Sequence, residues 1–409
     1  MTRAAKEKYH GTSATSEVRE FRIRMGMELD LMNLWFGKTA DYFKQFISDQ
    51  TIGMARINRF DFTTLPINLL YLLYYEYRRN EKESLNFSFF EYGKNLNDNP
   101  DDDRWEMYLE LQEMYAILQR WYNDKELYHY LGFLFFNFKA QTPFRDIYTQ
   151  WKALNSRDKF LKDIQHTIAT RMLDRYLEET EKAAPDYQKC LKTMTEAISD
   201  FRENWYNNDK ELYQILILLD IFRILDSKSI KKLPTDYFTR KSGQKDGEDK
   251  EHILSQTPRK DNGEIATIKT DWEKFVQSED FKDIRSQMQD ILNHSDAELT
   301  EQELIQLQNL LNSAGLNSIG NMALLDLRIN RSYGNADYTH KRTIIFQEYM
   351  NQKYVRPHTL AVFMKGDIDA REATGIPLNR WTLEDIKRNT DKIAKEIGKN
   401  FNAWLTQNN

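Results

Sequence analysis

KEHILSQ, residues 250–256, is the stretch that decides how the C-terminal part of this chain folds. It sets an acid, Glu251, beside His252 at the start of a short apolar run. The order EHIL predicts a short β-strand, and because side chains alternate between the faces of a strand, Glu251 and His252 start on opposite faces. Strand twist and a following loop can still bring both side chains to one phosphate at the end of the strand. In a chain with only 7 histidines, the pair is a candidate for chemistry.

The sequence before this strand predicts one helix after another. Apolar residues recur there at helical spacing, with few glycines or prolines inside the periodic segments. The predicted helices cover residues 16–36, 65–79, 103–121, 124–138, 157–179, 185–206 and 209–226. Further helices are predicted around 270–292 and 300–312, and an amphipathic helix at 383–404 is predicted to begin after Thr382 as its cap.

A change of composition separates the two regions. Residues 227–250 carry charge, glycine and proline without apolar periodicity, which is typical of a linker or domain edge. We therefore predict a mainly α protein with a helical domain at 1–235 and a small α+β domain at 236–409.

One phrase recurs within the helical region. RWYNDKELYHYLGFLFF at 120–136 returns as NWYNNDKELYQILILL at 204–219. In each copy a helix is predicted to end, turn through Asn-Asp and restart, with Asp124 and Asp209 as N-caps. Aromatic residues at helical spacing usually face a core, so we interpret the Trp-Tyr pairs as scaffold that braces helix hairpins.

Composition excludes several classes of protein. A hydrophobic content of 40% with 13% aromatic residues indicates a globular chain, and the single cysteine, Cys190, cannot form an internal disulfide. The longest apolar runs are too short to span a bilayer, so we predict a soluble, cytoplasmic protein without a membrane segment. The net charge of −5 argues against a chain that coats nucleic acid over its whole surface. A local basic site is compatible with it, since residues 321–409 carry 14 Lys and Arg against 10 Asp and Glu.

Two asparagines complete the pattern that begins at the acid-histidine pair. IGNMALLD at 319–326 predicts a glycine turn into a second apolar strand, and Asn321 stands at its start. Asn330, in RINRSYGN at 328–335, stands where a helix could begin. The order is an acid and a histidine on one strand, an asparagine at the next strand and an asparagine at a helix.

This order resembles the HNH, or ββα-metal, nuclease motif, and in particular the HNH domain of GmrSD-type modification-dependent restriction enzymes. EHI at 251–253 with Gln256 resembles the family's acid-His-Ile-x-Pro-Gln signature, with Ser255 in place of the proline. IGNMALLDLRIN resembles its Ile-Gly-Asn-Leu-x-Leu-Leu followed by Asn, and Lys341 falls where the family has a lysine. The terminal WTLEDIKRNTDKIAKEIGKNFNAWL and the earlier WYNDKELYHYLGFL also resemble the family.

The resemblance implies a role for each polar residue of the motif. His252 is expected to be the general base, since a near-neutral imidazole accepts a proton at physiological pH. Asn321 is expected to orient the imidazole. Glu251 and Asn330 are expected to hold one Mg²⁺ through oxygen ligands, and Mn²⁺ can substitute for it.

Lys341 and Arg342 are candidates for contacts with backbone phosphates of nucleic acid. A solvated helix face is the alternative for both, and His340 is a weaker rival for a third metal ligand. A lone strand histidine is more often satisfied by a neighbour than catalytic, and asparagine is common in turns and at helix caps. The ordered set, and not any one residue, favours catalysis.

The resemblance implies a metal-dependent phosphodiesterase, namely a DNA endonuclease that acts in phage defence on DNA that can carry modifications. Such enzymes usually carry an N-terminal ParB-like nucleotidase domain with an Asp-Gly-Gln-Gln-Arg motif, and this sequence has neither that motif nor a P-loop. A nucleotidase sensor chain, or a missing N-terminal domain, is therefore an expected partner. The alternatives are a catalytically inactive DNA-binding or scaffolding subunit and an RNA nuclease.

Overall fold

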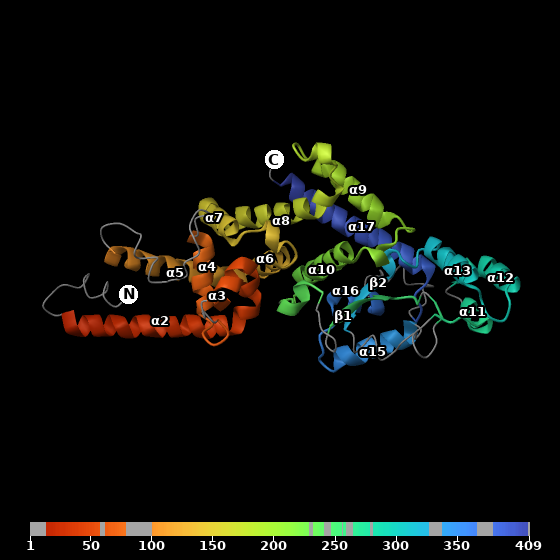
Figure 1. The fold of residues 1–409 in the computed structure, drawn as a ribbon, viewed down its shortest axis with the longest axis horizontal. Helices are drawn as coiled ribbons and strands as arrows, with labels where there is room; N and C mark the ends of the chain where they lie inside the picture. The colour runs from red at the N-terminus through yellow and green to blue at the C-terminus, as the bar shows by residue number, and fades with distance from the viewer. Residues whose placement is uncertain are drawn as a thin grey trace. The chain divides into compact units, whose positions relative to one another are not determined.

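The computed structural model shows a mainly helical chain, with one two-stranded sheet in the part that it describes (Figure 1). Contacts divide the chain into two compact units, residues 1–164 and 165–409. The sequence-predicted domain boundary at 235 rests on a change in composition and stays a prediction. The described residues are 14–57, 62–78, 100–228, 232–240, 247–255, 257–258, 265–278, 281–326, 338–365 and 379–407.

The first unit is built from helices. They are α2 (Ala14–Phe43), α3 (Asp49–Ile57), α4 (Asn68–Arg78), α5 (Pro100–Asn123), α6 (Lys125–Asn137), α7 (Phe144–Leu154) and the start of α8 (Arg157–Leu173), with short 3-10 turns at Lys44–Phe46 and Lys139–Gln141. Helices α3 and α7 were not predicted from the sequence. Aromatic rings fill much of the core, and Phe46 stacks on Phe135 with 3.8 Å between ring centroids.

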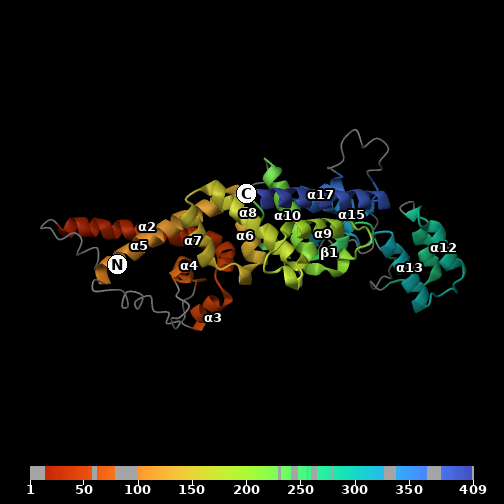
Figure 2. The same cartoon turned by 90° about the horizontal axis from the view of Figure 1, so that it is seen from above.

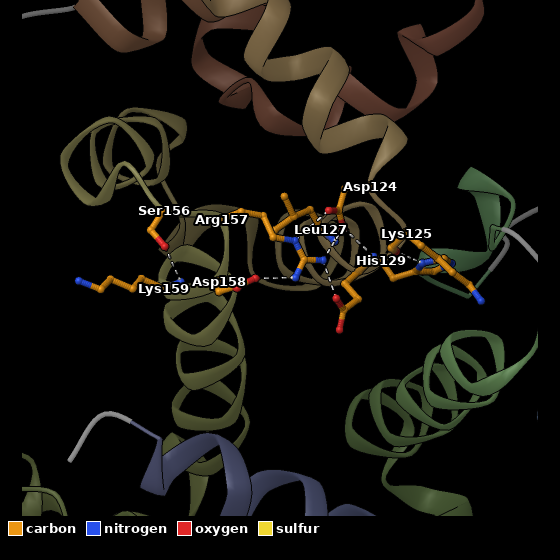
Figure 3. A network of polar contacts seen from close by, with 9 residues as sticks. Asp124, Lys125, Leu127, His129, Ser156, Arg157, Asp158 and Lys159 are labelled. Atoms are coloured by element: carbon orange, nitrogen blue, oxygen red, sulfur yellow. Dashed lines mark hydrogen bonds and ion pairs between the residues drawn. The ribbon is translucent and has the colours of Figure 1, made fainter.

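Asp124 caps α6, as the sequence predicted. Its carboxylate accepts hydrogen bonds from the backbone N–H groups of Glu126 and Leu127, which have no partner inside the helix. Figure 3 shows the guanidinium of Arg157 facing this carboxylate, with both Arg157–Asp124 hydrogen bonds at 2.9 Å. Burial alone would raise the pKa of Asp124, but the bonds from Arg157 and the backbone outweigh it and hold the pKa below its usual value.

Asp124→Ala is expected to reduce the free energy of unfolding by about 1–2 kcal/mol at neutral pH, because the cap is lost and Arg157 keeps fewer partners. A carboxylate with a depressed folded-state pKa stabilises the fold above its unfolded pKa, and this contribution is lost as the pH falls through the folded value. The difference between wild type and variant should therefore shrink below about pH 4. Urea unfolding at several pH values measures it. Asp158→Ala, at an exposed partner of Arg157, is the matched control and should change little.

The second unit contains the remaining helices and the sheet. The helices are α9 (Tyr187–Ser199), α10 (Asp209–Asp226), α11 (Lys269–Val276), α12 (Arg285–Asn293), α13 (Glu301–Ser313), α15 (Tyr338–Met350), α16 (Pro357–Met364) and α17 (Leu383–Thr406). Short 3-10 turns lie at Asp174–Tyr176, Glu179–Glu181, Trp205–Asn207, Thr235–Phe238 and Ile319–Asn321. Helices α9 and α17 pack side by side (Figures 1 and 2). Thr382 caps α17 in a capping box with Asp385, which confirms the predicted start of this helix.

The second copy of the repeated phrase does not fold like the first. The sequence predicted Asp209 as an N-cap, and this is wrong: Asp209 is the first residue of α10, and Asn208 stands at the cap position without a capping bond. The carboxylate of Asp209 instead accepts from the ammonium of Lys250. The helix that precedes it has already ended at Ser199, so the Trp-Tyr pair lies on a 3-10 turn. The carboxylate that was predicted to cap α10 therefore pairs with a cation from a distant strand.

The sheet pairs two short antiparallel strands. They are β1 (Glu248–His252) and β2 (Met322–Asp326), with Glu248 opposite Asp326 and His252 opposite Met322. Strand β2 is buried along most of its length because α16 packs against it. The chain between the strands forms α11, α12 and α13, whose apolar residues join the core of the second unit. In chain order, the sheet and the helix after it give a strand, a strand and then α15.

Candidate active site

The predicted acid-histidine pair lies at the end of β1. Glu251 pairs with Ala323 of β2, and His252 pairs with Met322. Strand pairing continues one residue further, since the N–H of Ile253 donates to the backbone carbonyl of Asn321 at 2.8 Å. The end of the strand is therefore held on its neighbour where the two polar side chains project.

The His252 imidazole is held on two sides. It is only 8% exposed, and its Nε2 lies 2.9 Å from Oδ1 of Asn317. Its ring stacks on Tyr206, with 4.6 Å between the centroids and 17° between the planes. The ammonium of Lys250 lies 4.1 Å from the centre of the same tyrosine ring and also bonds to the carbonyl of Tyr206. Ring plane and ring rotation are thus both restrained.

The side chain of Asn321 makes its hydrogen bonds to the backbone and not to the imidazole of His252. Its Oδ1 accepts from the N–H of Leu254 at 2.8 Å, and its Nδ2 donates to the carbonyls of Leu254 and Leu316 at 3.0 and 2.9 Å. The two bonds to Leu254 hold the turn that follows β1, and the bond to Leu316 holds the loop that precedes β2. The acceptor beside the imidazole is Asn317, four residues earlier in the sequence. The contact that was predicted between Asn321 and His252 is therefore made by Asn317 instead.

Gly320 is required where the turn meets α17. A Cβ at this position would collide with the carbonyl of Ile386 and with Thr390. The carbonyl of Gly320 also accepts from Nδ2 of Asn389 on the same helix at 2.9 Å. The glycine therefore lets α17 support the turn that carries Asn321.

Glu251 and Lys341 meet across the ββα arrangement. Lys341, on α15, is fully buried, and its Nζ donates to Oε1 of Glu251 at 2.7 Å and to the carbonyl of His252 at 2.6 Å. The Glu251 side chain is 19% exposed, and its other oxygen, Oε2, makes no hydrogen bond within the described residues. Lys341 thus ties the helix to the strand. A phosphate contact from this ammonium, as the sequence suggested, would require it to leave these two acceptors.

Two further candidates from the sequence, Arg342 and His340, lie on α15 beside Lys341. Arg342 is half-buried, donates from Nε to the carbonyl of Phe363 at 2.9 Å and lies over the ring of Phe346. His340 is exposed on the same helix. Asn330 lies outside the described residues. Within the described part of the chain, no three His, Cys, Asp or Glu side chains gather to hold a metal ion.

A buried ion triad fixes the start of β1. Arg356 is 2% exposed and bonds to both carboxylate oxygens of Glu248, at 2.8 and 2.7 Å, and to Asp220 of α10 at 2.8 Å. Burial alone would lower the pKa of Arg356, but the two carboxylates outweigh it and raise the pKa, so the guanidinium stays charged. The strand that carries the site is therefore clamped between α10 and α16.

A comparison with family models identifies the segment that contains these residues. Residues 195–396 match the model of the C-terminal domain of GmrSD restriction endonucleases. This segment, just under half of the chain, is similar to that C-terminal domain. It indicates a nuclease, as the sequence resemblance implied. No curated protein matches the chain, and no solved structure does. None of the described helices is long and apolar enough to cross a membrane.

The matched segment includes two residues that contact His252 and that the sequence did not indicate. Tyr206 belongs to the repeated Trp-Tyr phrase and was interpreted as scaffold, whereas its ring stacks on the imidazole. Asn317 has no motif of its own, and its position four residues before the motif asparagine is the signal that could have suggested it. Both residues lie on short turns, where the spacing of apolar residues does not indicate which way a side chain points.

Proposed function

We propose that this chain is an HNH-type, Mg²⁺-dependent DNA endonuclease, the nuclease part of a modification-dependent restriction system that acts in phage defence. The main support is geometric: an acid and a histidine end β1, β2 pairs with them, and α15 follows and bonds to the acid through Lys341. This strand-strand-helix order lies inside the segment that is similar to the GmrSD C-terminal domain.

In the proposed reaction His252 accepts a proton from water while the water oxygen forms a bond to the phosphorus of the DNA backbone. The bond from phosphorus to the 3′ oxygen breaks, and that oxygen takes up a proton from solvent. The products are a 5′-phosphate and a 3′-hydroxyl. Stacking on Tyr206 keeps the imidazole in one plane, which favours a base held in position before the substrate arrives.

Glu251 is the one described residue that we propose as a ligand, for a magnesium ion that retains most of its water. Glu251 offers Oε2 as an oxygen ligand, and Mg²⁺ commonly binds through one or two carboxylates plus water and phosphate. Asn330, which lies outside the described residues, is the proposed second ligand. When bound, the ion supplies charge that stabilises the negative transition state. The ammonium of Lys341 keeps the carboxylate turned toward the end of the strand.

Glu251→Gln is expected to raise the Mg²⁺ concentration for half-maximal cleavage by at least roughly 10- to 100-fold, because the side chain loses its charge and keeps a single oxygen. When that oxygen accepts from Lys341, the fold should persist and an NH₂ group takes the place of the oxygen offered to the metal. Metal titrations of plasmid cleavage measure the shift, and Asn330→Ala should shift the titration in the same direction. An unchanged titration would remove the altered residue from the ligand set.

Arg342 is the proposed contact for the DNA backbone, since its side chain is only half-buried, whereas the ammonium of Lys341 is fully buried. The local excess of positive charge in residues 321–409 is small. Few phosphates can be neutralised, so affinity for DNA should be modest and fall steeply with salt. A nucleotidase sensor chain or domain is the proposed partner, because holding the same DNA would raise its concentration at the nuclease site.

Incubation of the chain with supercoiled plasmid, with Mg²⁺, with Mn²⁺ and with chelator, tests this function. We expect nicking that requires the metal and weakens with salt. A parallel incubation with RNA, and one with modified DNA and nucleoside triphosphate, tests the substrate class and the sensor. Absence of cleavage under all metal conditions would favour a DNA-binding or scaffolding subunit.

A further inference from the structure

The loop before β2 is built to hold Asn317 in one place. Two residues after the end of α13, Gly315 has a left-handed backbone conformation with φ of 89°. The N–H of Leu316 returns to the carbonyl of Leu311 at 3.2 Å, and that of Gly315 returns to Asn312 at 2.9 Å. This is the hydrogen-bond pattern of a Schellman turn. Together with the bond from the N–H of Trp205 to the carbonyl of Asn317 at 3.0 Å, it fixes the backbone of the asparagine.

The side chain of Asn317 is held as firmly as its backbone. It is 6% exposed, its Nδ2 donates to Oδ1 of Asn312 at 2.7 Å, and its Oδ1 lies 2.9 Å from Nε2 of His252. An amide has one acceptor end and one donor end. Because the donor end is taken by Asn312, the acceptor end faces the imidazole, and Nε2 must carry the hydrogen that completes the bond.

We propose that Asn317, oriented by Asn312, is the positioning residue that fixes the tautomer of His252. In a neutral imidazole with its hydrogen on Nε2, the lone pair is on Nδ1, which becomes the atom that accepts the proton from water. This inference rests on the proposed function for its catalytic consequence, but the tautomer itself does not. If the side-chain amides of Asn312 and Asn317 were both turned over, Asn317 would donate to Nε2, and the hydrogen of the neutral imidazole would lie on Nδ1.

The tautomer is measured directly on the full chain labelled with ¹⁵N-histidine, at a pH of about 8.5, where imidazole is ordinarily neutral. The His252 signals are assigned by their loss in His252→Asn. We expect a protonated Nε2 and an unprotonated Nδ1. A protonated Nδ1 would overturn the inference whatever the cleavage activity, so its failure is distinct from failure of the proposed function.

The positioning role is tested by three variants in the cleavage assay. Asn317→Leu removes the acceptor at similar size, and we expect kcat to fall roughly 10- to 100-fold with KM little changed, because the residue is buried away from DNA. Asn317→Asp keeps an acceptor for Nε2, and Asn312 can turn its amide to donate to it, so most activity should return. Asn309→Leu, at an exposed asparagine of α13, is the matched control.

The pattern across the variants separates positioning from a merely structural role. If Asn317 only supported the loop, Asp and Leu would impair kcat alike, and that result would overturn the proposal. A wild-type kcat in Asn317→Leu would do the same. If Asn317→Leu does not fold, Asn312→Leu, at a half-buried position, provides the second test: a loss of kcat supports the proposal and an unchanged kcat overturns it.

Discussion

His252→Asn is expected to reduce DNA cleavage by about 10²- to 10⁴-fold, the usual contribution of a general base. Asparagine has neither a group that takes up a proton near neutral pH nor a ring to stack on Tyr206. Only 8% of His252 is exposed, so a small loss of stability should accompany the loss of activity. Nicking of supercoiled plasmid at saturating Mg²⁺ gives the rate.

The same substitution at His294, whose side chain is 81% exposed at the end of α12, is the matched control and should leave the rate unchanged. Circular dichroism and the melting temperature of each variant establish that a lost rate is not lost folding. If His252→Asn nicked plasmid as fast as wild type while folded, another group would have to be the base.

Arg356→Met is expected to cost about 3–5 kcal/mol of the free energy of unfolding of the second unit, because two buried carboxylates lose their cation. Glu248 and Asp220 are almost fully buried, and both face the guanidinium at 2.7–2.8 Å. The side chain of methionine is shorter but flexible and of similar volume, so the loss reflects unpaired charge more than an empty cavity. Urea unfolding of wild type and variant measures the difference.

Arg202→Met is the matched control, since Arg202 is exposed and surface substitutions usually change stability by less than about 0.5 kcal/mol. Adding Glu248→Gln and Asp220→Asn to Arg356→Met should recover much of the loss, because neutral amides remove the unpaired charges. A loss below about 1 kcal/mol in the single variant would contradict the assignment of the triad as the clamp of β1.

Long periodic helices could be predicted from the sequence because burial repeats every three to four residues. Helix α10 begins and ends at the predicted residues, and α17 begins after its predicted cap. Short elements were missed: α7 has only 11 residues, although Phe144, Ile147 and Tyr148 are buried on one face. Asp209 was misjudged as a cap because capping depends on local geometry, and the competing cation, Lys250, is 41 residues away.

The candidate site was partly predictable for a related reason. Glu251 and His252 can be recognised in the sequence because an acid and a histidine are adjacent, and the structure places them at the end of a strand. Their partners cannot be recognised in this way, because Tyr206, Asn317 and Lys341 come from three other elements. A buried lysine cannot be distinguished from a surface lysine by its neighbours in the sequence, so Lys341 was expected at the DNA and lies against Glu251.

The distances along the chain between these partners bear on how the molecule folds. His252 meets Asn317 across 65 residues, Glu251 meets Lys341 across 90, and Glu248 meets Arg356 across 108. Helices form from local contacts within microseconds. Closing such long loops costs chain entropy, and this cost is offset only by contacts that form after closure. We therefore expect strand pairing, and not helix formation, to limit the folding rate of the second unit. During synthesis, Arg356 must have left the ribosome before the strand that carries Glu251 and His252 can be held in place.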